Sequence, residues 1–205
     1  MTKLFEIFFP KYLWRIKTTE KKIFLTFDDG PIPEVTDWVL DQLRQYNAKA
    51  TFFVVGENVT KNPEIFRRIM ADGHAVGNHT YNHLKGWKTE SGAYLANFIK
   101  CENEIQGSNA ESKLLFRPPY GQLKRRQATE ILKTHEIVMW SVLTRDYEER
   151  LDKEKCLKRA IQKTGNGSIV LFHDSIKAQK NLRYVLPRFL EYFSKKDFEF
   201  CAIKL

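Results

Sequence analysis

Short apolar runs alternate along the chain with longer stretches in which apolar residues recur at helical spacing. The short runs are rich in β-branched and aromatic residues, which favour strands, whereas the longer stretches have the amphipathic pattern of helices. This alternation is typical of βα units around a mostly parallel sheet and predicts an α/β fold. The expected strands are Ile23–Phe27, Ala50–Val55, His74–Gly77, Leu114–Arg117, Ile137–Val142, Ser168–His173 and Phe198–Ile203. The expected helices contain Val35, Val39, Leu40 and Leu43, then Ile65, Ile69 and Met70, and then residues 92–106, 123–134, 152–164 and 178–195.

Seven expected strands are enough for a barrel or a large open sheet. A chain of 205 residues can bury a sizeable core, and no Gly/Pro/Ser-rich linker, charge block or internal repeat divides it. We therefore expect residues 1–205 to form a single domain. A hydrophobic content of 42% with 13% aromatic residues excludes a disordered chain.

Polar side chains with chemical potential follow four of these strands directly. They are Asp28 with Asp29, then His79, then Arg117, and finally His173 with Asp174. Ligands of α/β folds gather at the carboxyl ends of the strands, so we expect these side chains to share one rim of the sheet.

His79 and His83 are four residues apart, about one helical turn, so that both rings can reach one ion from the same face. Asp29 can complete a set of three ligands. Three protein ligands leave coordination positions open for water and substrate, as in catalytic zinc sites. Asp28 then remains as a general base, and the pattern predicts a metal-assisted hydrolase.

Each of these motifs alone has a simpler interpretation. Asp-Asp-Gly-Pro is commonly a turn, an HxxxH pair is often one face of an ordinary helix, and RPPYG can be a rigid loop. Their common placement after strands favours a shared site.

A net charge of +9 and a pI of about 9.4 would suit a polyanion such as nucleic acid, an anionic membrane surface or an acidic cell-wall polymer. Lysines and arginines are spread along the whole chain, which favours the simpler interpretation of a solvated basic surface. No nucleic-acid-binding motif is present, so we expect no nucleic-acid partner.

Cys101, Cys156 and Cys201 are widely spaced and contain no CxxC pair, which argues against a disulfide framework and favours a reducing compartment. The apolar run Leu4–Phe9 is too short for a signal-peptide core or a membrane span. These features make the cytoplasm the default localisation. The aromatic N-terminal segment is expected to pack on the sheet, with peripheral membrane contact as the alternative.

Five segments together carry a family resemblance. In chain order they are TFDDGP, HTYNH, RPPYG, WSVLTRDY (Trp140–Tyr147) and LFHD (Leu171–Asp174), and they span residues 26–174. With these segments the chain resembles the polysaccharide deacetylase family, the NodB-homology group of carbohydrate esterase family four. The resemblance implies a distorted barrel of seven or eight β/α units, a bound divalent metal, and removal of N-acetyl or O-acetyl groups from a polysaccharide.

The resemblance also implies a role for each matching residue. Those roles are catalytic base for Asp28, metal ligands for Asp29, His79 and His83, orientation of the base for Arg117, oxyanion donor for the Tyr120 N–H, general acid for His173, partner of that acid for Asp146, and lining of the acetyl pocket for Leu171.

The chain departs from the family pattern where Tyr147 follows Asp146, because the fourth motif usually closes with a tryptophan. Asp174 is an alternative partner for His173, or it caps the following helix. Trp87 could stack on a sugar ring or belong to the core. His74 and His135 match no motif, and we expect both to be packed or solvated.

The preferred function is deacetylation of an N-acetylglucosamine-type polysaccharide or oligosaccharide. The alternatives are an O-acetyl esterase acting on a xylan-type polymer and a catalytically idle glycan-binding module of the same fold. Two histidines and a carboxylate suit Zn²⁺ best, and also accept Co²⁺, Ni²⁺ or Fe²⁺. The partner is then an acetylated glycan, which suggests association with the cell envelope against the cytoplasmic default, and no pattern indicates an oligomeric state.

Overall fold

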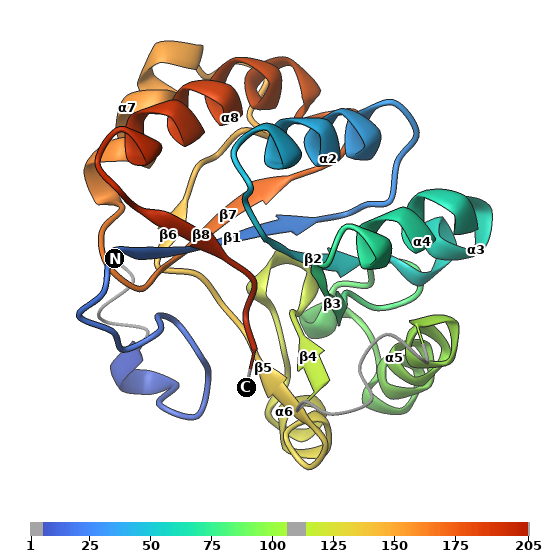
Figure 1. The fold of residues 1–205 in the computed structure, drawn as a ribbon. Helices are drawn as coiled ribbons and strands as arrows, with labels where there is room; N and C mark the ends of the chain where they lie inside the picture. Colours follow the sequence, from blue (N-terminus) through green and yellow to red (C-terminus); the bar gives the residue numbers. More distant parts are fainter. Residues whose placement is uncertain (1–5, 106–113, 205) are drawn as a thin grey trace.

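The computed structural model describes residues 6–105 and 114–204 and confirms the predicted α/β fold as a distorted, curled half-barrel. Every pairing between its named strands is parallel, and the strands follow the order β5-β4-β3-β2-β1-β7-β6, with β8 also paired to β1 (Figure 1). The strands are β1 (Lys22–Asp28), β2 (Thr51–Val54), β3 (Ala75–Asn78), β4 (Leu114–Phe116), β5 (His135–Ile137), β6 (Val142–Leu143), β7 (Ser168–His173) and β8 (Glu199–Cys201).

Helices surround the outside of the curled sheet (Figure 1). The helices are α2 (Val35–Gln45), α3 (Gly56–Lys61), α4 (Pro63–Ala71), α5 (Ser91–Ile105), α6 (Arg125–Ile131), α7 (Lys153–Lys163) and α8 (Gln179–Ser194), with short 3₁₀ turns η1 (Gly86–Lys88) and η2 (Pro119–Gly121). Beneath them, the ring of Phe27 stacks on Phe52 and Phe172 at centroid distances of 5.1 and 5.7 Å. This ladder ties β1 to its neighbours β2 and β7.

The alternation of side chains along β1 decides which of its residues reach the inside of the curled sheet. Ile23, Leu25 and Phe27 pack in the large cluster beneath the helices, whereas Phe24 belongs to a separate cluster on the inner face. Thr26 and Asp28 share the parity of Phe24 and therefore face inward. In β7, His173 pairs in register with Asp28, so the two side chains leave the sheet at the same level.

Most of the predicted elements are present, with boundaries that differ by a few residues. The prediction of a single strand Ile137–Val142 is wrong, because β5 ends at Ile137 and β6 begins at Val142. The Val138 N–H donates to Phe116 O of β4, while the Ser141 N–H donates to Ile169 O of β7. The chain thus crosses from one edge of the sheet to the other, which gives the half-barrel its curl. Helix α3 was not predicted.

The N-terminal segment is divided between packing and exposure. Trp14 is buried in a cluster with Phe116 and Ile137, in agreement with the expected packing on the sheet. Ile7 and Phe8, by contrast, are 74% and 68% exposed. The first part of the run Leu4–Phe9 lies outside the described residues. Within residues 6–105 and 114–204, no helix has both the length and the apolar character to cross a membrane.

Candidate active site

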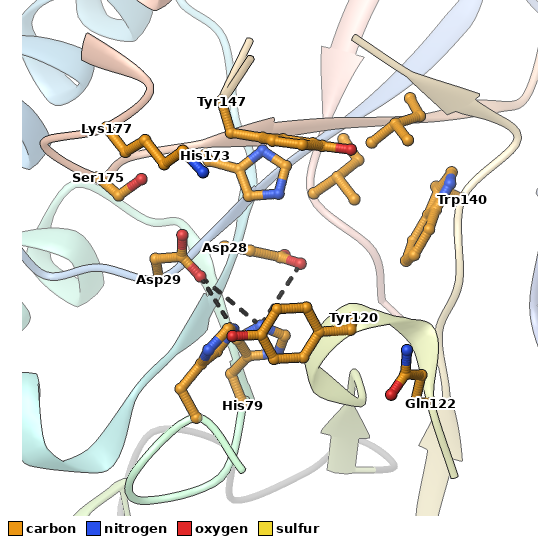
Figure 2. A pocket seen from close by; sticks show the side chains of 13 residues that line it. Asp28, Asp29, His79, Tyr120, Gln122, Trp140, Tyr147, His173, Ser175 and Lys177 are labelled. Atoms are coloured by element: carbon orange, nitrogen blue, oxygen red, sulfur yellow. Dashed lines mark ion pairs between the residues drawn. The ribbon is translucent and has the colours of Figure 1, made fainter. Parts of the chain in front are cut away.

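A pocket of about 640 Å³ opens at the carboxyl ends of the strands (Figure 2). It is lined by Asp28 at the end of β1 and Asp29 directly after it, by His79 and His83 after β3, and by Leu171 and His173 of β7. The expectation that separate strand ends converge on one rim therefore agrees with the geometry. Tyr120 from η2 and Tyr147 after β6 complete opposite walls.

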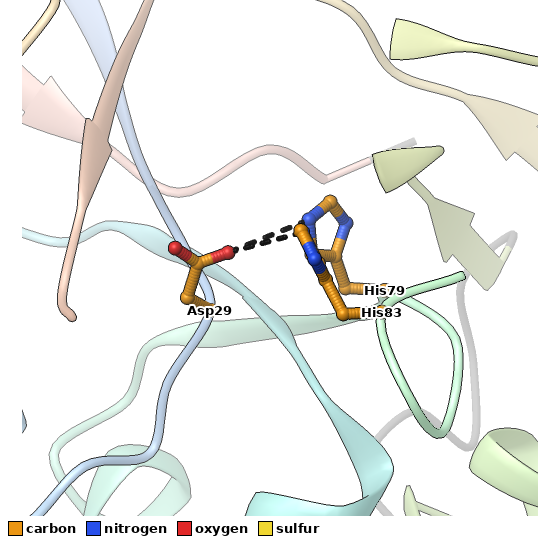
Figure 3. Close-up of side chains that lie close together, drawn as sticks. All are labelled: Asp29, His79 and His83. Carbon is orange, nitrogen blue, oxygen red and sulfur yellow. Dashed lines mark ion pairs between the residues drawn. The ribbon is translucent and has the colours of Figure 1, made fainter. Parts of the chain in front are cut away.

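Asp29, His79 and His83 offer one ligand atom each, and these atoms all lie within 4.8 Å of one another (Figure 3). Asp29 Oδ1 is 3.3 Å from Nε2 of His83 and 3.9 Å from Nε2 of His79. A continuing strand would direct Asp29 away from Asp28, but its φ of 88° breaks the alternation, so both carboxylates line the pocket.

The two histidines have the protonation state that a metal requires. His79 Nδ1 lies 2.7 Å from Arg117 O; since a carbonyl only accepts, Nδ1 carries the proton and Nε2 keeps its lone pair. Burial, reinforced by the neighbouring His83, holds the pKa of His79 well below its usual value. Burial also lowers the pKa of His83. Two neutral imidazoles and a carboxylate are a donor set that fits a catalytic divalent ion.

The prediction that His79 and His83 lie on one helical turn is wrong, because HTYNH forms a loop after β3. Thr80 and His83 have φ angles of 64° and 54°, which no helix contains. The Asn78 side chain accepts the Thr80 N–H at 2.8 Å, and the Thr80 hydroxyl accepts the Leu84 N–H at 3.1 Å. These bonds fold the loop back on itself and bring the ring centroids of His79 and His83 to within 5.0 Å of each other.

Asp28 is held by a fully buried arginine. Arg117 Nη1 donates to Asp28 Oδ1 at 2.7 Å, and the other guanidinium donors reach Thr26 Oγ1, Val138 O and Met139 O at 2.7–3.0 Å. Burial lowers the pKa of Arg117, and the charge of Asp28 opposes that effect. One carboxylate oxygen of Asp28 is thus fixed, while Oδ2 points to the metal side, 3.7 Å from His79 Nε2.

His173 lies across the pocket from the metal triad and is oriented by Asp146. Its Nδ1 is 2.8 Å from Asp146 Oδ1, and its backbone N–H donates to Asp146 Oδ2 at 2.8 Å. Burial alone would lower the pKa of His173, but the charge and hydrogen bond of Asp146, aided by Asp29 and Asp28, raise it to about 9. The imidazole is therefore a proton donor near neutral pH whose Nε2 is left to face the pocket.

Asp174 is not the partner of His173. Its carboxylate accepts the Gly30 N–H at 3.0 Å and the Thr36 hydroxyl at 2.6 Å, and its own N–H donates to Asp28 O at 3.0 Å. Burial raises the pKa of Asp174 to about 8. Asp174 therefore fastens the loop after β1 to the end of β7, beneath the pocket.

The close contact between Gly30 and Asp174 should make Gly30 sensitive to substitution, because an added Cβ would lie 1.9 Å from Asp174 Oδ2. Gly30→Ala is expected to lower the free energy of unfolding by about 1–3 kcal/mol, since the clash must displace a buried, hydrogen-bonded carboxylate. Gly165→Ala is the control, because a Cβ there has nothing within 4 Å. Denaturant unfolding of both variants measures the difference; equal stabilities would contradict the tight packing around Asp174.

The remaining predicted residues occupy different places. Tyr120 has a φ of 59°, and the hydrogen bonds of its turn come from the N–H groups of Gly121 and Gln122, which leaves the Tyr120 N–H out of both. Leu171 lines the pocket floor on β7. Trp87 does not line this pocket: its indole N–H donates to Leu123 O at 3.1 Å, and it borders an adjoining groove.

Sequence reasoning missed several residues of the pocket wall. Tyr147 packs its ring edge-on against His173 at a centroid distance of 4.9 Å, and Trp140 also lines the pocket. Both lie within the WSVLTRDY segment, which was the available signal. Ser175 and Lys177 follow β7 in a stretch that carries no motif, so the sequence gave no reason to select them.

Comparison with known proteins gives consistent matches. The family model described as polysaccharide deacetylase matches residues 15–140. A peptidoglycan-N-acetylglucosamine deacetylase of Bacillus cereus is 34% identical over 93% of this chain and 90% of its own. A crystal structure of the Bc1960 peptidoglycan N-acetylglucosamine deacetylase superposes with a TM-score of 0.87 at 31% identity, covering 94% of this chain and 91% of that one.

Several relatives are much longer than this chain. The peptidoglycan-N-acetylglucosamine deacetylase PgdA of Listeria monocytogenes is 35% identical over 90% of this chain, but the match spans only 38% of the relative. The region shared with PgdA is nevertheless nearly all of the present chain.

Proposed function

This chain belongs to the polysaccharide deacetylase family, and we propose that it removes N-acetyl groups from an N-acetylglucosamine-containing glycan with the help of a divalent metal ion. The observation that carries the proposal is the arrangement around one pocket of a three-ligand donor set, a carboxylate held by Arg117, and a histidine held by Asp146. These are the parts that amide hydrolysis requires: an ion, a base and an acid.

Asp29, His79 and His83 would hold the ion, for which zinc is the best match. When bound, such an ion polarises the acetyl carbonyl and makes water more acidic. Asp28 Oδ2 accepts a proton from the attacking water, because Oδ1 is occupied by Arg117. The bond from Arg117 to Oδ1 keeps Asp28 ionised and oriented, while Oδ2 remains available for the proton.

The other residues act on the charge and the proton that the attack generates. The Tyr120 N–H donates to the developing oxyanion, and the turn that follows two prolines holds this donor in place beforehand. His173 gives its Nε2 proton to the departing sugar nitrogen, so that acetate and a free amine are the products. Leu171 offers an apolar contact for the acetyl methyl group.

Two alternatives from the sequence compete with this proposal. The presence of Asp28, Arg117 and His173 with their partners favours an enzyme over an idle glycan-binding module. An O-acetyl esterase would use the same groups, so acetate release from N-acetylglucosamine oligomers and from acetylated xylan should be compared. Faster release from the oligomers is the expected result; release from xylan alone would reassign the substrate. The similarity to peptidoglycan-N-acetylglucosamine deacetylases favours a cell-envelope glycan.

The proton-donor assignment of His173 predicts the alkaline limb of the pH profile. The donor form exists below the pKa and is lost as the pH rises through it, so kcat should fall at or below about pH 9, because a bound cation lowers the value further. Asp146→Asn removes the charge that raises this pKa and should move the limb to lower pH. kcat measured from pH 6 to 10 tests this; an unmoved limb would exclude His173 as the titrating acid.

A further inference from the structure

A second cavity, of about 430 Å³, adjoins the pocket. We call it the aromatic groove; its own walls include Tyr12, Trp14, Trp87, Met139, Arg159 and Lys163. It shares Tyr120, Gln122, Trp140 and Leu143 with the pocket, so the two spaces are continuous. Figure 2 shows Trp140 and Gln122 on the side of the pocket away from Ser175 and Lys177, which places the groove to that side.

The walls of the aromatic groove suit the face of a sugar ring. Trp87 is 62% exposed and Tyr120 54% exposed, although both are large apolar groups that folding normally buries. The indole of Trp87 is fixed by its bond to Leu123 O, and the Tyr120 ring packs at 4.7 Å on His83. Fixed aromatic faces offer apolar contact at low entropic cost. Since a glycan continues beyond the sugar that reacts, its next sugar is the natural occupant of this adjoining space.

The charge of the aromatic groove adds a second requirement. Arg159 and Lys163 are four residues apart on α7 and both line the groove. None of its described lining residues is acidic, and neither cation forms an ion pair within the described part of the chain. Arg159 Nε donates to Leu143 O at 3.2 Å, which anchors this charge beside a residue common to both cavities. Two cations in a largely apolar groove favour an anionic ligand.

We propose that the aromatic groove binds a neighbouring sugar that carries a carboxylate, with Arg159 and Lys163 as its counter-charges. The inference rests on the proposed deacetylase function and narrows its substrate class. A glycan in which acetamido sugars alternate with acid-bearing sugars satisfies both cavities. N-acetylmuramic acid is such a sugar where its lactyl carboxyl carries no peptide. A neutral homopolymer of N-acetylglucosamine satisfies only the pocket and the aromatic walls.

The test uses three substrates: an oligomer of alternating N-acetylglucosamine and N-acetylmuramic acid, the methyl ester of the same oligomer, and a chitooligosaccharide. kcat/KM for acetate release should be about five-fold higher for the free acid than for its ester, a difference typical of a partly exposed ion pair. The preference should shrink at high salt. Lys163→Gln and Arg159→Gln should each reduce the acid-to-ester ratio, and the double variant should bring it close to one.

Lys158→Gln is the matched control, because Lys158 is an exposed lysine of α7 outside the groove. It should retain the wild-type ratio. Equal kcat/KM for acid and ester in the wild type, or a ratio unchanged in the double variant, would overturn the groove assignment while deacetylation of the chitooligosaccharide stands.

Binding of the acid and of the ester to the Asp28→Asn variant tests the groove independently of catalysis. The two dissociation constants are the quantities to measure. If no substrate released acetate, the proposed function would fail, and the ratio of these two constants would decide the groove. Tighter binding of the acid in Asp28→Asn, lost when Lys163→Gln and Arg159→Gln are both added to that variant, supports the groove assignment. Equal constants overturn it.

Discussion

Asp28→Asn is expected to lower kcat for deacetylation by about 10²–10⁴ while the protein still binds zinc. An asparagine cannot accept the water proton, but it has nearly the same shape and keeps an acceptor for Arg117. The guanidinium also retains its bonds to Thr26, Val138 O and Met139 O, so the buried cation stays hydrogen-bonded in the variant. Acetate release and zinc content, measured on the same preparation, test the prediction.

Asp41→Asn provides the control for the loss of one carboxylate. Asp41 lies on α2 in a surface ion pair with Arg68, and its replacement should leave kcat unchanged. Wild-type turnover by a zinc-loaded Asp28→Asn protein would remove Asp28 from the role of base. A variant that lost its zinc would instead show that Asp28 contributes to metal binding.

His79→Ala is expected to weaken zinc binding by more than about 100-fold and to abolish acetate release. Mutation of residues that only orient the metal ligands already costs up to about 100-fold in metal affinity, and loss of a ligand should cost more. His79 is 2% exposed, and its Nε2 lies 3.7 Å from Asp28 Oδ2 and 3.9 Å from Asp29 Oδ1. The two ligands that remain, Asp29 and His83, are too few to fix the position of the ion. Competition with a chelator of known affinity measures the change.

His74→Ala distinguishes this effect from the general loss of a neutral, half-buried histidine. His74 Nδ1 accepts the Ala50 N–H at 3.2 Å, and desolvation lowers the pKa of His74 to about 4, so this half-buried imidazole is also neutral. It lies outside the pocket and should be dispensable for zinc binding. Stoichiometric, tight zinc in His79→Ala, or its loss in His74→Ala, would contradict the assigned ligand set.

The fold could be predicted because hydrophobic periodicity is a local property. Parallel strands such as β1 and β7 are buried on both faces and therefore appear as continuous apolar runs. The crossing segment between β5 and β6 could not be predicted, since its backbone N–H groups donate to Leu13, Phe116 and Ile169 on three different parts of the chain. Periodicity within the segment contains no information about such distant partners.

The candidate site was predictable where its residues follow strands directly, as Asp28 and His173 do. The shape of the HTYNH loop was not, because it depends on two positive φ angles and on Asn78. The choice between Asp146 and Asp174 as the partner of His173 likewise required the structure. Asp174 is adjacent to His173 in sequence, whereas Asp146 lies in the WSVLTRDY segment. Trp87 follows the HTYNH motif closely along the chain but borders the aromatic groove instead of the pocket, and its contact with a sugar ring stays a prediction.

The most direct test of the account is zinc titration of the metal-stripped protein while acetate release from N-acetylglucosamine oligomers is followed. We expect no release without metal and a rate that rises to a plateau at one zinc ion per chain. Acetate release at an undiminished rate from the metal-free protein would contradict it, as would a zinc-saturated protein that releases no acetate from oligomers, peptidoglycan or acetylated xylan.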